Sequence, residues 1–172
     1  MTHGAESLTW WQEDPRRLER EVASMSQVAP ELAWSAEAGA WAGRLPVWPF
    51  ERPEPAGLEE LVIEPLQVLV VPSAAHPMIA PAFVPQDVDV PAGAIGFTEW
   101  HVAPDQSLCL LQSAAAWRPE GTIADLVPKA SGWYIEYLLL RRGSVKAMTI
   151  NGIVTDPSID DVIRDKERRG EG

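Results

Sequence analysis

The sequence predicts an α+β domain in which helices pack on an antiparallel sheet. Three observations support this prediction: a helical pattern near the N-terminus, short β-branched runs in the middle of the chain, and a second helical pattern after residue 122. Helix, strands, an extended segment and a helix therefore follow one another in order, as in α+β domains. With 172 residues, 46% of them hydrophobic, the chain can form one domain with a core.

The N-terminal pattern predicts a helix from Asp14, an N-cap residue followed by Pro15, to about Val28. Apolar residues at helical spacing predict its buried stripe, which consists of Leu18, Val22 and Met25. Three arginines fall largely off this stripe, and we expect them in solvent: Arg16, Arg17 and Arg20.

Strands are expected at 32–36 and 41–48, where short apolar and aromatic runs occur. Residues 58–71 contain the most β-branched apolar run, which Pro65 must break or place at a sheet edge. The five prolines within 72–95 exclude a helix or a central strand there. We therefore expect that segment to be extended and to wrap the sheet.

A short strand is expected at 94–101, and a polar turn at 103–107 then leads into an apolar run. Thr122 and Asp125 predict a capping box that opens the second helix, with a kink possible early in it. Basic residues followed by Gly143 predict its end.

We expect the domain to span residues 14–155, with a small last element at 145–154. Residues 1–13 are expected to be poorly ordered, although their two tryptophans can dock on the domain. Residues 156–172 are expected to form a charged tail, which is either frayed or a solvated helix. No apolar run reaches the roughly 20 residues that cross a bilayer, and no signal-peptide pattern begins the chain. The expected location is cytoplasmic, with no membrane partner.

The net charge of −11 argues against a nucleic-acid partner, which needs a cationic surface. A local basic cluster on an acidic body instead suggests a protein partner or, more simply, a solvated helix face. The cluster is Arg16, Arg17 and Arg20. One cysteine and three widely spaced histidines show no metal-ligand pattern, and no internal disulfide is possible.

The segment around Cys109, the only cysteine, contains the candidate reactive residues. His101 lies eight residues before it, and Trp117 lies eight residues after it and begins a Trp-x-Pro-x-x-Thr turn with Pro119 and Thr122. A cysteine thiolate is a strong nucleophile and a fair leaving group, so it can carry an acyl group as a thioester. A lone cysteine beside leucines can also be a small buried apolar residue.

The block from Cys109 to Thr122 resembles the catalytic segment of ubiquitin-conjugating enzymes, in which the cysteine precedes the tryptophan of the same turn by eight residues. The family's earlier proline motif is echoed by Val71-Pro72, His76-Pro77 and Pro81-Ala82-Phe83. The order of elements over about residues 14–140 also agrees. The chain looks most like the conjugating-enzyme-like proteins of bacterial ubiquitin-like modification operons.

This resemblance implies an antiparallel meander sheet with an N-terminal helix and further helices after the cysteine loop. It implies that Cys109 receives a ubiquitin-like protein from an adenylating enzyme and passes it to a target lysine without a cofactor, in a bacterial pathway of antiphage defence. It also implies that the basic face of the first helix binds the adenylating enzyme, through Arg16, Arg17 and Arg20.

The chain departs from the family in lacking the His-Pro-Asn tripeptide upstream of the cysteine. His101 falls at the position of the asparagine, so it either supplies polar support to the oxyanion or is a structural remnant. Asp105 is a second candidate near the thiol, and backbone N–H groups of residues 107–110 are candidate oxyanion donors. We expect Trp117, Pro119 and Thr122 to be scaffold, and His76 to be structural.

Three readings remain at this point. Loss of the asparagine favours a catalytically silent variant that only binds a ubiquitin-like protein, whereas retention of Cys109 favours an active carrier. An unrelated α+β binding domain with a chance motif match is the third reading.

Overall fold

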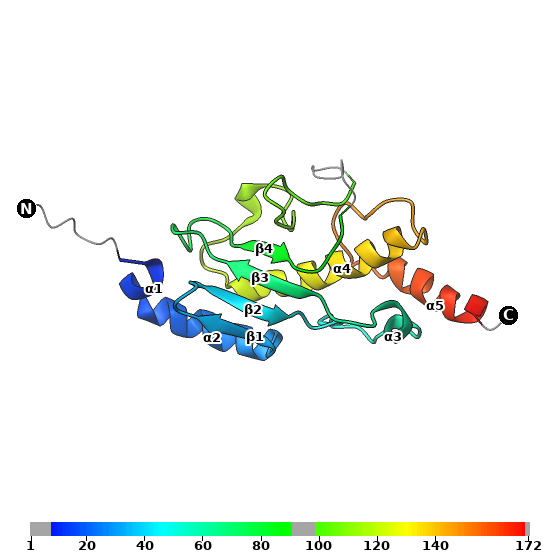
Figure 1. The fold of residues 1–172 in the computed structure, drawn as a ribbon, viewed down its shortest axis with the longest axis horizontal. Coiled ribbons are helices and arrows are strands. Elements are labelled where there is room, and N and C mark those ends of the chain that lie inside the picture. The colour runs from blue at the N-terminus through cyan, green and yellow to red at the C-terminus, as the bar shows by residue number, and fades with distance from the viewer. Residues whose placement is uncertain (1–7, 91–98, 171–172) are drawn as a thin grey trace, which may run out of the picture.

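The computed structural model describes residues 8–90 and 99–170, and these form an α+β fold. Four strands make an antiparallel sheet in the order β1-β2-β3-β4 (Figure 1). Their bounds are β1 (Leu32–Ser35), β2 (Ala40–Arg44), β3 (Gln67–Val71) and β4 (Ala82–Pro85). Because the strands neighbour one another in chain order, the predicted antiparallel meander is confirmed.

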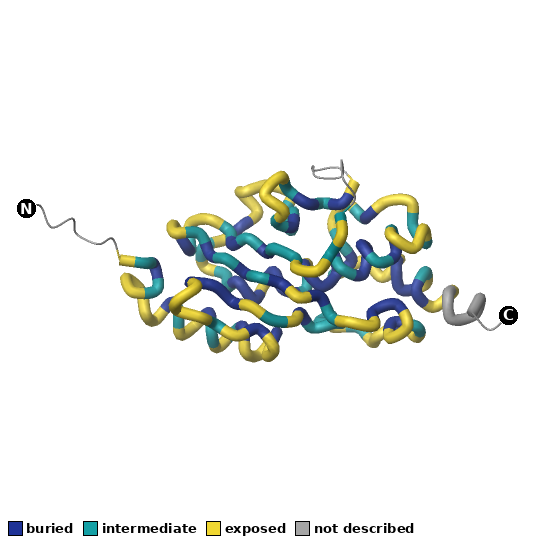
Figure 2. Tube along the Cα trace, viewed as in Figure 1, coloured by how far each residue is buried: buried dark blue, intermediate teal, exposed yellow. Residues whose placement is uncertain are grey.

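One face of the sheet is buried beneath helices. The strand register places Trp41, Val70 and Phe83 side by side across three strands, and each is at most 1% exposed. Alternate residues of a strand point to opposite faces, so this row lies at the centre of the core. Helices α2 (Pro15–Val28) and α4 (Val127–Arg141) lie behind the sheet in the view of Figure 1. Figure 2 shows buried positions along the strands and α4.

Helix α2 forms where the sequence predicts it. The Asp14 carboxylate accepts the N–H of Arg17 at 2.9 Å, which satisfies one free donor of the first turn. Of the predicted stripe, Met25 is buried, and Leu18 and Val22 are partly buried against the core. Arg17 is also buried, against the expectation that all three arginines lie in solvent.

Both predicted ends of the domain need correction. A short helix, α1 (Trp10–Glu13), precedes α2, and Trp10 is buried with its ring centroid 4.6 Å from that of His76. The prediction of poor order is therefore wrong for residues 8–13. At the other end, α5 (Ser158–Gly170) buries Ile159 and Ile163 in a second apolar cluster, so it is neither frayed there nor wholly solvated.

The proline-containing segments are only partly as predicted. Pro65 separates a single helical turn, α3 (Leu58–Leu61), from β3, so the first half of the 58–71 run is not a strand. The segment after Val71 is not merely wrapped around the sheet, because β4 joins the sheet as its edge strand. Proline is tolerated at that edge because a missing N–H breaks no interior pairing. The strand predicted at 94–101 falls mainly outside the described residues, and residues 99–100 form a turn.

The second helix begins at the predicted capping box. The N–H of Thr122 donates to the Asp125 carboxylate at 2.7 Å, and a 3₁₀ turn, η2 (Ile123–Leu126), leads directly into α4. Gly143 follows with φ of +68°, the left-handed conformation that glycine adopts after a helix. Residues 144–157 contain no helix or strand, so the small element predicted at 145–154 is an irregular loop.

Candidate functional site

Cys109 lies at the base of a short hairpin between β4 and the α4 region. Its N–H donates to the carbonyl of His101 at 2.8 Å, and Val102 pairs with Leu108 in an antiparallel bridge. The Leu108 N–H also donates to the carbonyl of Phe83 at 2.8 Å, which ties the hairpin to β4. The eight-residue spacing of the histidine and the cysteine therefore places them opposite each other.

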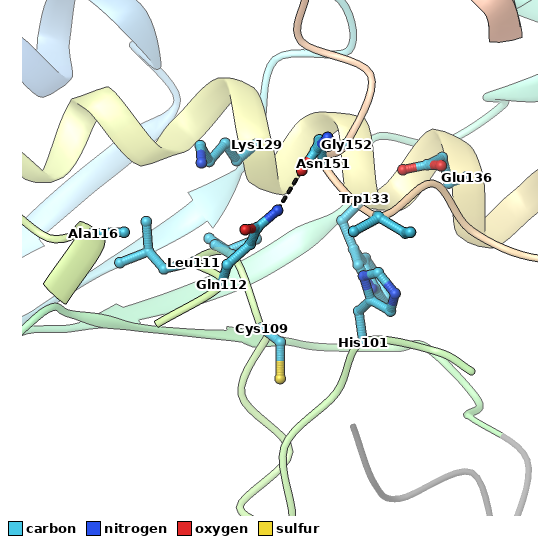
Figure 3. Close-up of a pocket in the computed structure, with 12 residues that line it drawn as sticks. His101, Cys109, Leu111, Gln112, Ala116, Lys129, Trp133, Glu136, Asn151 and Gly152 are labelled. Carbon is cyan, nitrogen blue, oxygen red and sulfur yellow. Dashed lines mark hydrogen bonds between the residues drawn. The ribbon is translucent and has the colours of Figure 1, made fainter. Parts of the chain in front are cut away.

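The two side chains at the base of the hairpin do not meet. His101 has φ of +50°, and in Figure 3 its ring projects towards α4, whereas the Cys109 thiol projects away from α4. No hydrogen bond joins the thiol to another residue drawn there. Burial, and secondarily the Asp105 carboxylate, raise the pKa of the Cys109 thiol. The half-buried thiol is therefore mostly protonated at neutral pH.

The predicted backbone oxyanion donors are already occupied. The N–H of Ser107 donates to the Asp105 carboxylate at 3.0 Å, and that of Leu110 to the carbonyl of Leu108 at 3.1 Å. The N–H groups of Leu108 and Cys109 donate to the carbonyls of Phe83 and His101, the two hydrogen bonds described above for the hairpin. Since each of the four has an intramolecular acceptor, the expectation that they face a thioester oxygen is not met in this conformation.

Asp105 lies at the exposed tip of the hairpin, away from its base. Its carboxylate accepts the Ser107 hydroxyl at 2.6 Å as well as the Ser107 N–H. These two hydrogen bonds hold the pKa of Asp105 below its ordinary value. Asp105 therefore acts on Cys109 as a nearby negative charge, and no described contact joins the two side chains.

A cavity of about 410 Å³ separates the hairpin from α4. His101 and Cys109 line it on one side, and the α4 residues Lys129, Trp133 and Glu136 line it on another. The carboxamides of Gln112 and Asn151 hydrogen-bond each other at its wall (Figure 3). The α4 residues are spaced i, i+4 and i+7, so one helix face supplies a cation, an aromatic ring and a carboxyl.

The arginines predicted to form a partner surface have different environments. Arg16 is exposed. Arg17 donates to the carbonyls of Pro119 and Gly121 at 2.6 Å each, and Arg20 donates to the Glu120 carbonyl at 2.8 Å. Arg17 and Arg20 thus bind the turn after the thiol segment. The expectation that the arginines lie in solvent holds for Arg16; Arg20 is exposed but hydrogen-bonded to this turn, and Arg17 is buried.

Glu21 is a key residue of this region that the sequence analysis missed. Its carboxylate is fully buried and receives Arg17 Nε at 2.7 Å, His76 Nε2 at 3.0 Å and the Ile123 N–H at 2.8 Å. It therefore joins α2, the proline segment and the start of η2. The available signal was its place between Leu18 and Met25, on the buried stripe of the helix.

The residues predicted as scaffold are placed accordingly. Trp117 is 8% exposed, and its indole N–H donates to the carbonyl of Pro77 at 2.7 Å. His76 is buried against Trp10 and Glu21, as expected for a structural histidine. The tryptophan turn and the proline segment therefore support each other.

No protein family, curated protein or solved structure matches the chain. Among the described residues, no cluster of three or more histidine, cysteine, aspartate or glutamate side chains is arranged to hold a metal ion. No helix in the described part of the chain is both long enough and apolar enough to cross a membrane.

Proposed function

We propose that this chain carries a ubiquitin-like protein as a thioester on Cys109. The observation that supports the proposal best is the position of the thiol: half-buried, after a hairpin tied to the edge strand, and before a tryptophan turn that leads into α4. The position agrees with the sequence resemblance.

The proposed chemistry has two acyl transfers. An adenylating enzyme uses ATP to activate the C-terminal carboxylate of the modifier, and the Cys109 thiolate attacks that acyl group, so AMP leaves and an S–C bond forms. A target lysine amine then attacks the thioester carbon, an amide N–C bond forms, and the thiol leaves with a proton. The protein needs no cofactor for either step.

This site makes removal of the thiol proton harder than it is for a solvated cysteine, because burial and Asp105 raise the pKa of Cys109. We assign the polar support to His101, which lies opposite the cysteine. In the present rotamers its ring and the thiol diverge, so this role requires one of the two side chains to rotate. Asp105 remains a carboxylate that can attract the ammonium group of an incoming lysine.

The role of His101 can be tested by substitution. His101→Asn keeps a residue that tolerates positive φ, whereas His101→Ala removes the polar group. We expect both variants to load normally and His101→Ala to discharge more slowly to a free amine. Normal discharge by His101→Ala shows that the histidine is structural.

A second candidate function is a silent variant that binds a ubiquitin-like protein without carrying it. The raised pKa of Cys109 and the occupied N–H groups of residues 107–110 favour it. Both features describe a thiol that the resting protein does not activate.

Gel electrophoresis with and without reductant separates the two functions. The chain is incubated with an adenylating enzyme and a ubiquitin-like protein of a bacterial ubiquitin-like modification operon, together with ATP. The carrier function predicts a reductant-sensitive adduct that is lost in Cys109→Ala and becomes reductant-resistant, as an ester, in Cys109→Ser. A stable complex without a covalent adduct would overturn it in favour of the binding variant.

A further inference from the structure

Glu136 is a buried carboxyl group that lines an accessible cavity. The residue is 3% exposed, and it belongs to the wall that α4 gives to the cavity beside Cys109. Among the described residues, only Thr149 hydrogen-bonds the carboxyl, with its backbone N–H at 2.6 Å from Oε1. One side of the carboxyl therefore remains available to a ligand.

No basic side chain of the described chain pairs with Glu136. None of the ion pairs in the described residues includes it. Lys129 lines the same cavity, but it lies seven residues earlier on α4, about 10 Å along the helix axis. In Figure 3 the two side chains are at opposite ends of the cavity. Burial, and secondarily the charge of Asp156, raise the pKa of Glu136, as expected for a carboxyl without a counter-ion.

A buried carboxylate without a partner is costly, and a bound cation relieves the cost. Trp133 lies between Lys129 and Glu136 on the cavity-lining face, where its ring can contact an alkyl chain or a cation. The volume of about 410 Å³ lies in the range of small-ligand sites. Because Thr149 holds Oε1, a monodentate ammonium group fits better than a bidentate guanidinium.

We propose that the cavity between Cys109 and α4 binds a primary ammonium group through Glu136, with a lysine side chain as its occupant. The occupant's identity rests on the proposed function, because an acceptor protein brings lysine side chains to the thiol. Glu136 is then a positioning residue: it holds a cationic side chain of the acceptor beside Cys109 and does not touch the reacting atoms.

The test uses the unloaded protein and two neutralised lysine analogues. Nα-acetyl-lysine methylamide carries the ammonium group, and Nα-acetyl-norleucine methylamide has nearly the same shape without it. Side-chain N–H resonances of Trp133, Gln112 and Asn151 report on the cavity in NMR titrations. We expect saturable shifts with the lysine compound and none with the norleucine compound.

Variants separate an ammonium site from a merely structural carboxyl. Glu136→Gln retains an acceptor for the Thr149 N–H, and we expect it to keep the fold and weaken lysine binding by about tenfold or more. Glu37→Gln removes an exposed carboxylate that does not line the cavity and should leave binding unchanged. Equal shifts with the two compounds, no saturable shift, or equal affinity in Glu136→Gln would overturn the proposal.

Even if Glu136→Gln fails to fold, comparing the lysine and norleucine compounds on the unaltered protein shows whether the cavity binds an ammonium group. The titration needs no thioester, so it can fail while Cys109 still loads. If Cys109 does not load and the lysine compound still binds, the ammonium site stands and the carrier function fails.

Discussion

The carboxylate of Glu21 on α2 accepts a 2.8 Å hydrogen bond from the backbone N–H of Ile123, the first residue of the 3₁₀ turn before α4. Both residues are fully buried. The first helix and the turn that follows the thiol segment therefore share one polar contact inside the core. Arg17 and His76 converge on the same carboxylate, so its loss affects three segments at once.

Removing this carboxylate should destabilise the fold strongly. Glu21→Ala leaves the buried Arg17 without its counter-ion, and such a loss typically costs about 3–5 kcal/mol of unfolding free energy. Glu21→Gln keeps an acceptor for Ile123 and should cost less. Urea denaturation measures both, and a loss below about 1 kcal/mol in Glu21→Ala would contradict the role of Glu21.

The same residue predicts how stability depends on acid. Burial alone would raise the pKa of Glu21, but hydrogen bonds from His76, Ile123 and Arg17 together hold it below its ordinary value of 4.5. A carboxyl with a lowered folded-state pKa adds stability above its unfolded pKa and loses it as pH falls through the folded pKa. The unfolding free energy should therefore decline below pH 4.5, and less steeply in Glu21→Gln. Parallel curves for the two proteins would count against this account.

The reactivity of Cys109 should depend on Asp105. The thiolate is the form that reacts, and burial together with Asp105 raises the pKa of Cys109, so alkylation by iodoacetamide at neutral pH should be slower than that of a cysteine peptide. Asp105→Asn removes the negative charge and should shift the rate profile to lower pH. Glu37→Gln, a change at an exposed turn outside the cavity, is the matched control. An unchanged profile in Asp105→Asn would show that the charge does not act on the thiol.

The arginines of α2 should separate into partner-facing and structural residues. Arg16 is exposed, so Arg16→Glu should keep the unfolding free energy and slow loading by the adenylating enzyme. Arg17→Ala should lower the unfolding free energy by about 3 kcal/mol or more, because it leaves the buried Glu21 carboxylate without its arginine counter-ion. Initial loading rates and urea denaturation measure the two effects. An unchanged loading rate in Arg16→Glu would assign that arginine to a solvated face.

Local signals predicted much of the fold. Asp14 with Pro15, and Thr122 with Asp125, satisfy free N–H groups within a few residues, so the starts of α2 and of η2 could be predicted from the sequence. Pro65 broke the 58–71 run as expected. The antiparallel meander agrees with what the resemblance implies, although the connection between β2 and β3 spans residues 45–66.

Features set by distant contacts could not be predicted in this way. Arg17 is buried because Pro119 and Gly121, more than 100 residues away, place carbonyls around its guanidinium. Tertiary packing likewise buries Ile159 and Ile163 in the charged C-terminal segment. For the site, the sequence made His101 and Cys109 candidates by their spacing, but it held no signal for the positive φ of His101 or for the divergence of the two side chains.

The central claim is that Cys109 carries an acyl group, and intact mass spectrometry tests it most directly. The protein is incubated with ATP, an adenylating enzyme and its ubiquitin-like protein. We predict a mass increase equal to the modifier less one water, which hydroxylamine reverses at neutral pH and which Cys109→Ala lacks. No increase, or an increase that persists in Cys109→Ala, would contradict the claim.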